Sequence, residues 1–242
     1  MLHATVRTLA VAALTLGVAA CGQQNVKQAH DHDEATAIAE PLPSLSITSP
    51  KEGEVLPSGD VTVTFDLKNY QVSPSAQHVH LILDNEPYQP IYDVSKPVVL
   101  KNVAPGSHTL RAFPSRAWHE SIKNPEAFAF VNFAVKKADN ARKIDPNAPL
   151  LTFSRPKGTY EGAAADRILM DFWLRNAELS PTGYKVRYTL DGKSTVLTEW
   201  LPVYFENLPS GTHTLKLELL DPAGKVVPGA YNSTTREFTV KR

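Results

Sequence analysis

The residues best suited to chemistry begin with two histidines spaced two apart, His78 and His80. Side chains at positions i and i+2 of a β-strand point to the same face. The two imidazoles are therefore close enough to share a metal ion or an anion. Val79 and Leu81 alternate with them and are expected to face the interior. We therefore place both histidines on an outer, polar face of a sheet.

A second polar group follows in the segment from Phe113 to Glu120, which we predict to be a hairpin tip. In immunoglobulin strand order, the strand with His78 lies antiparallel beside the strand that leads into this hairpin. Arg111 alternates with Leu110 and Ala112, so it should share the outer face of the histidines. The predicted ligand-binding cluster, expected to be partly exposed, is His78, His80, Arg111, Arg116, Trp118, His119 and Glu120.

Three interpretations of this cluster stay open. Arginine forks with histidine donors suit a small anionic ligand that carries carboxylate or phosphate. The histidines His78, His80 and His119 could instead hold zinc or copper. In the third interpretation Trp118 folds back on the sheet and Arg116 pairs with Glu120, which only braces the loop. Tyr88 and Tyr92 are candidates to line the same surface, but the sequence does not place them.

An internal repeat shows which of these residues are particular to one part of the chain. Three segments recur in order, which indicates one structural plan used twice. The matched pairs are 69–74 with 176–181, 79–84 with 186–191, and 102–110 with 207–215. The second copy has Lys185 and Arg187 in place of His78 and His80, and Ala223 and Gly224 in place of Trp118 and His119. His108 and His213 are shared, so we expect them to bond neighbouring backbone groups.

Each copy of the repeat has the pattern of β-strands. Val61, Val63 and Phe65 alternate with polar residues, the period of a half-buried strand, and Asp191-Gly192 is a hairpin signal. The pattern resembles the immunoglobulin and fibronectin type III modules found in tandem on bacterial surface proteins. The expected fold class is all-β, with two tandem immunoglobulin-like β-sandwich domains at 44–137 and 149–242. A polar linker, 138–148, should join two separable domains with modest mutual contacts.

The amino-terminal residues have the order of a secretory signal peptide at 1–20. Arg7 precedes an apolar run from Leu9 to Val18, and small residues lead to Cys21. Residues 18–21 resemble the lipobox of bacterial lipoproteins, which implies that Cys21 is acylated and anchors the chain in a membrane. The alternative is an ordinary signal peptide with a chance cysteine. Residues 21–43 should form a disordered tether, and Gly22 resembles the outer-membrane sorting pattern.

Composition excludes several functional classes. Twenty-five basic and 25 acidic side chains balance, which argues against nucleic acid as a partner, and a single cysteine excludes an intramolecular disulfide. No phosphate-binding glycine loop or hydrolase motif is present.

We therefore expect a non-enzymatic, extracytoplasmic lipoprotein of the cell envelope, in the outer membrane if the host has one. It would be an interaction or ligand-binding module whose first domain binds an anionic ligand or an envelope protein. The first alternative is a periplasmic or surface metal-binding protein that uses the three histidines, helped by His30 and His32 in the tether. The second is a hydrolase with His119 as base and no identified nucleophile. No cofactor is expected, apart from zinc or copper in the metal-binding alternative.

Overall fold

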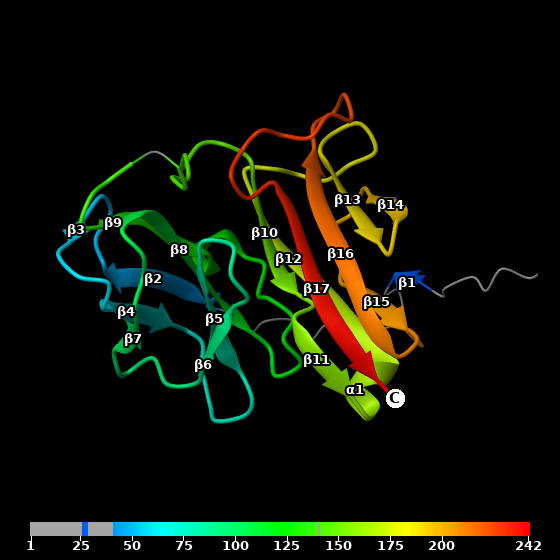
Figure 1. Cartoon of the computed structure of the whole chain (residues 1–242), viewed down its shortest axis with the longest axis horizontal. Helices are drawn as coiled ribbons and strands as arrows, with labels where there is room; N and C mark the ends of the chain where they lie inside the picture. The colour runs from blue at the N-terminus through cyan, green and yellow to red at the C-terminus, as the bar shows by residue number, and fades with distance from the viewer. Residues whose placement is uncertain (1–25, 29–40, 140) are drawn as a thin grey trace, which may run out of the picture.

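The computed structural model describes residues 26–28, 41–139 and 141–242, and its all-β architecture of two β-sandwiches confirms the predicted fold class (Figure 1). Two sheets pack together in the first sandwich. The smaller sheet has the order β2 (Ser44–Ser49), β4 (Val61–Lys68), β7 (Val98–Leu100). The larger has the order β3 (Val55–Leu56), β9 (Ala129–Val135), β8 (Gly106–Ser115), β5 (His78–Leu83), β6 (Gln89–Ile91).

The second sandwich repeats this plan. One sheet has the order β1 (Val26–Gln28), β15 (Val203–Glu206), β12 (Arg167–Arg175), β10 (Leu150–Arg155). The other has the order β11 (Gly158–Glu161), β17 (Ser233–Lys241), β16 (Gly211–Leu220), β13 (Lys185–Leu190), β14 (Lys193–Leu197). Among the residues that the structure describes, the helical elements are one α-turn, α1 (Ala163–Asp166), and one 3-10 turn, η1 (Pro125–Ala127). Neither approaches the length needed to cross a membrane.

The predicted signal peptide, Cys21, His30 and His32 lie outside the described residues. Within the predicted tether, β1 pairs antiparallel with β15 at the edge of the second sandwich. These three residues, Val26–Gln28, therefore have strand structure where the sequence analysis expects disorder.

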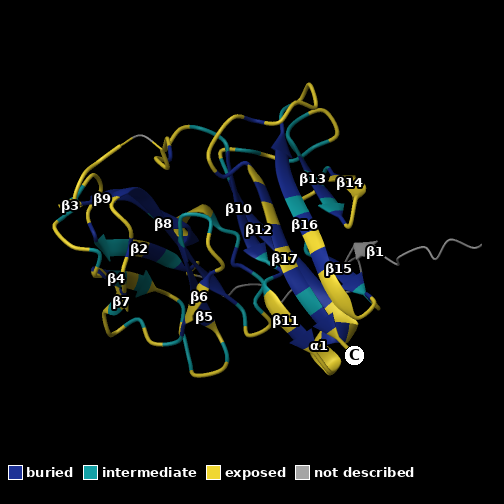
Figure 2. Cartoon of the chain, in the orientation of Figure 1, coloured by how far each residue is buried: buried dark blue, intermediate teal, exposed yellow. Residues whose placement is uncertain are grey.

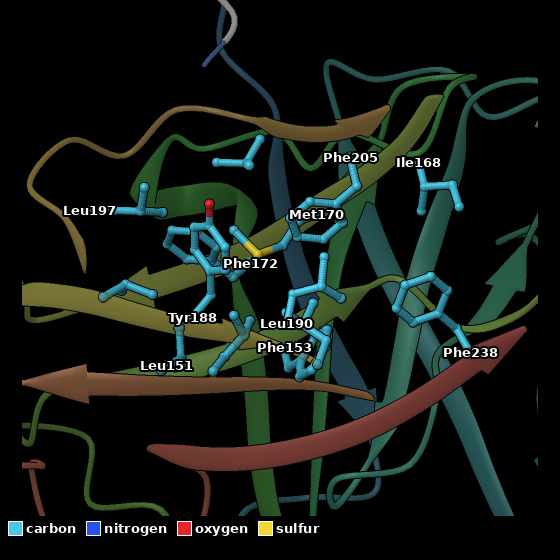
Figure 3. Close-up of a cluster of buried hydrophobic side chains, with 14 of the residues drawn as sticks. Leu151, Phe153, Ile168, Met170, Phe172, Tyr188, Leu190, Leu197, Phe205 and Phe238 are labelled. Carbon is cyan, nitrogen blue, oxygen red and sulfur yellow. The ribbon is translucent and has the colours of Figure 1, made fainter. Parts of the chain in front are cut away.

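In both sandwiches, the alternate apolar residues of the strands face the core, as the sequence pattern predicts. Val61 and Val63 are fully buried in the first core, which also contains Val79 and Leu81. Figure 3 shows the corresponding core of the second sandwich, where Met170 and Phe172 from β12 pack among aromatic and aliphatic side chains. Alternation therefore identified the inward-facing residues of these strands.

The repeat is reproduced in its turns and in its shared histidines. Asp84 and Asp191 end equivalent strands with φ of 50° and 47°. His108 Nδ1 lies 2.8 Å from Asp84 Oδ2 and its Nε2 lies 2.7 Å from the carbonyl of Ala104. His213 makes the same pair of contacts, to Asp191 and to the carbonyl of Pro209. The structural role predicted for both histidines, including a bond to a neighbouring backbone group, is confirmed.

The expectation of modest contacts between the sandwiches is wrong. A third apolar cluster joins the outer face of the β5–β8–β9 sheet to the outer face of β10 and β12. Its buried members are Ile82, Tyr88, Phe113, Phe128, Ile144, Leu150, Trp173 and Tyr231. Figure 2 shows these facing strands as buried. Alternation marks one face of each strand as core, but it does not reveal that a second domain covers the other face.

The segment predicted as a linker is packed against both sandwiches at several points. Ile144 is 5% exposed, and its N–H and carbonyl are hydrogen-bonded by the buried Asn132 side chain. The carbonyl of Arg142 accepts hydrogen bonds from Thr109 Oγ1 and Tyr231 Oη, one from each sandwich. The connection therefore holds the two domains together through defined contacts.

Candidate metal centre

Strand register brings the three candidate histidines together. His78 pairs with Ser115 at the end of β8, so the start of β5 meets the hairpin that follows β8. His78 Nε2 lies 3.0 Å from His80 Nε2 and 3.0 Å from His119 Nδ1. One ring nitrogen from each histidine can be chosen so that all three lie within 4.8 Å of one another. The predicted neighbourhood of strand and hairpin is therefore present.

The hairpin holds His119 in an unusual backbone conformation. Its φ is 71°, in the left-handed region that residues with a Cβ atom seldom adopt. The equivalent turn of the second copy has Gly224 there, with φ of 79°, and both turns close with matching backbone hydrogen bonds. The first copy therefore keeps an imidazole at a position where glycine is the unstrained choice. Strain of this kind is concentrated at functional sites.

The predicted exposure of the strand histidines is wrong. His78 and His80 are both 0% exposed, although they do lie on the outer face of their sheet. Part of the cover comes from the second sandwich, where Ser154 Oγ lies 3.0 Å from His80 Nδ1. His119, at the hairpin tip, is partly exposed. The site is thus enclosed between domains, with its histidines from the first and part of its cover from the second.

Hydrogen bonds to the Nδ1 atoms of His78 and His80 orient the Nε2 atoms of both rings toward each other. His78 Nδ1 lies 2.7 Å from the carbonyl of Ala76, which can only accept, so Nδ1 carries the proton and Nε2 a lone pair. His80 Nε2 and His119 Nδ1 both approach that nitrogen. In this arrangement a metal ion could accept one lone pair from each of the three rings.

Tyrosine and phenylalanine rings surround the cluster. Tyr88 stacks on His80 with ring centroids 3.5 Å apart, and its hydroxyl lies 3.2 Å from His119 Nδ1. The Tyr92 ring lies 4.9 Å from the ring of His78, and Phe113 contacts His80 edge-on at 5.4 Å. Both tyrosines that the sequence could not place therefore line the site. These rings exclude water and fix the orientation of the imidazoles.

Burial keeps the three imidazoles neutral near pH 7. Loss of hydration lowers the pKa of His78, holds the pKa of His80 well below its usual value, and lowers the pKa of His119 to about 3. The neighbouring cations Arg155 and Lys157 lower each pKa further. Neutral imidazole is the form that binds metal ions.

The second sandwich contributes residues that the sequence analysis missed. Ser154, Arg155 and Lys157 lie at and just beyond the end of β10, and Lys157 Nζ lies 4.3 Å from the Tyr88 ring centroid. Their positions depend on how the two domains pack together. No spacing within the first repeat could have identified them.

Arg111 does not join the histidines. It is fully buried opposite Ile82, whereas the residue of β8 opposite His80 is Phe113. Its guanidinium hydrogen-bonds the Asp84 carbonyl and Thr152 Oγ1, and lies 4.1 Å from the Tyr231 ring centroid. The prediction of an exposed anion-binding arginine is wrong here, because the second domain covers this face. Arg111 instead connects the two sandwiches.

Arg116, Trp118 and Glu120 form a brace around the turn that carries His119. Trp118 is 51% exposed, and its indole N–H donates to Glu120 Oε2 at 2.9 Å. The Arg116 guanidinium lies 5.4 Å from the Trp118 ring centroid. Trp118 therefore does not fold back on the sheet, and the bracing interpretation is supported only in that Trp118 contacts both Arg116 and Glu120. It does not account for the convergence of the histidines.

Comparison with known proteins identifies no family for this chain. No family model and no curated protein matches the chain. Fibronectin(III)-like modules of Clostridium thermocellum CbhA are similar at 16% identity over 81% of this chain and 94% of theirs, with a TM-score of 0.29. The fibronectin-III array of RIM-binding protein is 7% identical over 84% of this chain and 70% of its own, with a TM-score of 0.29.

A putative membrane anchored protein from Corynebacterium diphtheriae is 12% identical over 81% of this chain and 58% of its own, again with a TM-score of 0.29. At these identities and TM-scores the likenesses support no assignment of family or function. The chain itself has two tandem β-sandwich domains.

Proposed function

We propose that this protein is a non-enzymatic lipoprotein of the cell envelope that binds a transition metal ion through His78, His80 and His119. The observation that carries the proposal is the convergence of three neutral imidazoles, in which one nitrogen of His80 and one of His119 each lie 3.0 Å from the same nitrogen of His78. The residues fit such an ion. Adjacent nitrogens around tetrahedral zinc, at Zn–N of roughly 2.05 Å, are about 3.3 Å apart. Two pairs in the cluster are 3.0 Å apart, and the three nitrogens lie within 4.8 Å of one another, so binding would draw the widest pair together.

The surroundings support a binding site over a purely structural cluster. The outward nitrogens of His78 and His80 are held by a backbone carbonyl and a hydroxyl, the arrangement that orients metal-binding histidines. The second copy keeps the turn but has Gly224 where His119 stands. A fold that needs only the turn has no use for the strained histidine.

The anionic-ligand alternative has less support. Arg111 is engaged between the domains, and Arg116 stacks on Trp118. Loss of these two arginines from the cluster leaves three imidazoles whose nitrogens face one another. Neutral nitrogen lone pairs suit a metal cation more than a carboxylate or phosphate, while the nearby cations Arg155 and Lys157 are the feature that would attract an anion.

The cellular location in this proposal rests on the sequence. Arg7, the apolar run to Val18 and the lipobox-like residues before Cys21 support export and acylation. The metal site would then stand outside the cytoplasm, tethered to a membrane by lipid. The tandem sandwiches give it a rigid, disulfide-free support.

Metal titration of the full mature chain, starting at Cys21, tests the binding proposal. We expect one equivalent of Zn(II) or copper to bind, measured by metal analysis after gel filtration and by competition with a chromogenic chelator. His119→Ala should abolish binding because it removes one of the three proposed ligands. Since His119 is partly exposed, the substitution should spare the interior packing.

The control His30→Ala/His32→Ala removes the tether histidines and should leave the stoichiometry at one. No bound metal in the parent chain, or equal binding in His119→Ala, would overturn the proposal. A far-ultraviolet circular dichroism spectrum of each variant verifies that the β-structure is intact.

A further inference from the structure

The charge around the three histidines bears on which ion they hold. The described metal-ligating cluster consists of neutral imidazoles alone, with no carboxylate or thiolate among its members. The charged side chains beyond the histidines that act electrostatically on all three rings are the cations Arg155 and Lys157. The ion would therefore bring its whole charge into a positive environment.

Burial makes that charge costly. His78 and His80 are 0% exposed, and Tyr88, which stacks on His80, is 3% exposed. The free energy of moving an ion from water into such an interior rises with the square of its charge. Repulsion by Arg155 and Lys157 rises in proportion to the same charge. Both effects penalise a divalent ion more than a monovalent one.

From this geometry we infer that the site selects monovalent copper, Cu(I), over divalent zinc and divalent copper. The inference rests on the proposed metal-binding function and specifies the ion. Three neutral imidazoles supply enough donors for Cu(I), which accepts low coordination numbers, and the aromatic wall excludes the water that a divalent ion would retain. The two cations come from the second sandwich, so ion selectivity is a property of the docked domain pair.

Lys157 provides the sharpest test because it is near the site without being a ligand. Its Nζ lies 4.3 Å from the Tyr88 ring centroid, and that centroid lies 3.5 Å from the centroid of His80. Lys157→Gln removes one positive charge while keeping much of the side-chain volume. The matched control is Lys225→Gln, the same charge change on an exposed turn of the second sandwich.

The experiment measures Cu(I), Cu(II) and Zn(II) dissociation constants of the full mature chain, each against a chelator of known affinity, with Cu(I) handled under anaerobic conditions. We expect Cu(I) to bind tightest. Lys157→Gln should strengthen divalent binding more than Cu(I) binding, reducing the selectivity ratio about tenfold, the effect of one charge at roughly 10 Å in a partly buried medium. Lys225→Gln should leave the ratio unchanged.

Two results would overturn the inference while leaving the proposed function intact. In the first, the parent chain binds Zn(II) or Cu(II) as tightly as Cu(I), and His119→Ala abolishes that binding. The other is an unchanged ratio in Lys157→Gln. Failure of every ion to bind would instead refute the proposed function itself.

Discussion

Ser154 links the second sandwich to the candidate metal centre through a single hydrogen bond. Its Oγ lies 3.0 Å from His80 Nδ1, and both residues are 0% exposed. In a metal-bound state His80 Nδ1–H donates to this oxygen, which leaves Nε2 free to bind the ion. Ser154→Ala removes the acceptor and leaves the buried Nδ1–H without a partner.

The expected effect follows from the role of such outer contacts. Loss of a hydrogen bond that orients a metal-binding histidine weakens metal affinity by about 10- to 100-fold, equivalent to about 1.4–2.7 kcal/mol. The metal-free protein should also lose about 1–3 kcal/mol in its free energy of unfolding, because the buried Nδ1 of His80 is left without its hydrogen-bond partner. No packing cavity larger than a hydroxyl group is created.

Thr152→Ser and Thr152→Ala provide the matched comparison. Thr152 lies two residues before Ser154 on the same face of β10, is also fully buried, and accepts a hydrogen bond from Arg111 Nη1 at 3.0 Å. Thr152→Ala should destabilise the protein to a similar extent without changing metal affinity, and Thr152→Ser should be nearly silent. Chelator competition gives the affinity, and urea unfolding of the metal-free chains gives the stability.

Equal losses of metal affinity in Ser154→Ala and Thr152→Ala would refute the reasoning. That outcome would mean that general loosening of the domain interface, and not the orientation of His80, controls the site. Unchanged affinity in Ser154→Ala, with reduced stability, would show that the hydrogen bond is structural alone.

Three further outcomes follow from the same structure. Burial holds the pKa of His80 well below its unfolded value, so below about pH 6.5 the unfolded chain binds a proton at His80 that the folded chain does not. His80 alone should therefore lower the free energy of unfolding by up to about 1.4 kcal/mol per pH unit as pH falls. In urea unfolding at several pH values, His80→Gln should reduce the slope to the part that His78 and His119 contribute. Arg111→Leu should reduce that free energy by about 1–3 kcal/mol, through unsatisfied Asp84 and Thr152 oxygens, yet leave metal affinity unchanged in chelator competition. Cys21→Ser should remove the acylation site and shift the protein from membrane to soluble or unprocessed fractions; a processed Cys21→Ser chain that stays with membranes would contradict lipidation.

Local patterns were sufficient to predict the strands and the presence of two similar domains. Alternation along β4 and β12, and the recurrent turn at Asp84 and Asp191, depend on residues near one another in the chain. The repeat added information of a different kind. Where both copies kept a histidine, as at His108 and His213, the structure gives it the same structural contacts.

The candidate site was predictable in part. Immunoglobulin strand order correctly brought His119 to His78, because register between neighbouring strands follows from connectivity. Exposure was predicted incorrectly for His78, His80 and Arg111, because the outer face of a sheet is solvent-exposed only when no other domain packs on it. Apolar residues such as Ile82 and Phe113 on that face were the available signal for a covered surface.

By itself, therefore, the sequence determined the all-β architecture, the duplication and the histidines that distinguish the first copy. These features can be read from the alternation of apolar and polar side chains, from the residues that form turns, and from the differences between the two copies. Tertiary structure alone decided that Ser154, Arg155 and Lys157 enclose those histidines and that Arg111 does not join them. The physical reason is that packing between two domains depends on the complementarity of whole faces, which no local pattern in either copy encodes.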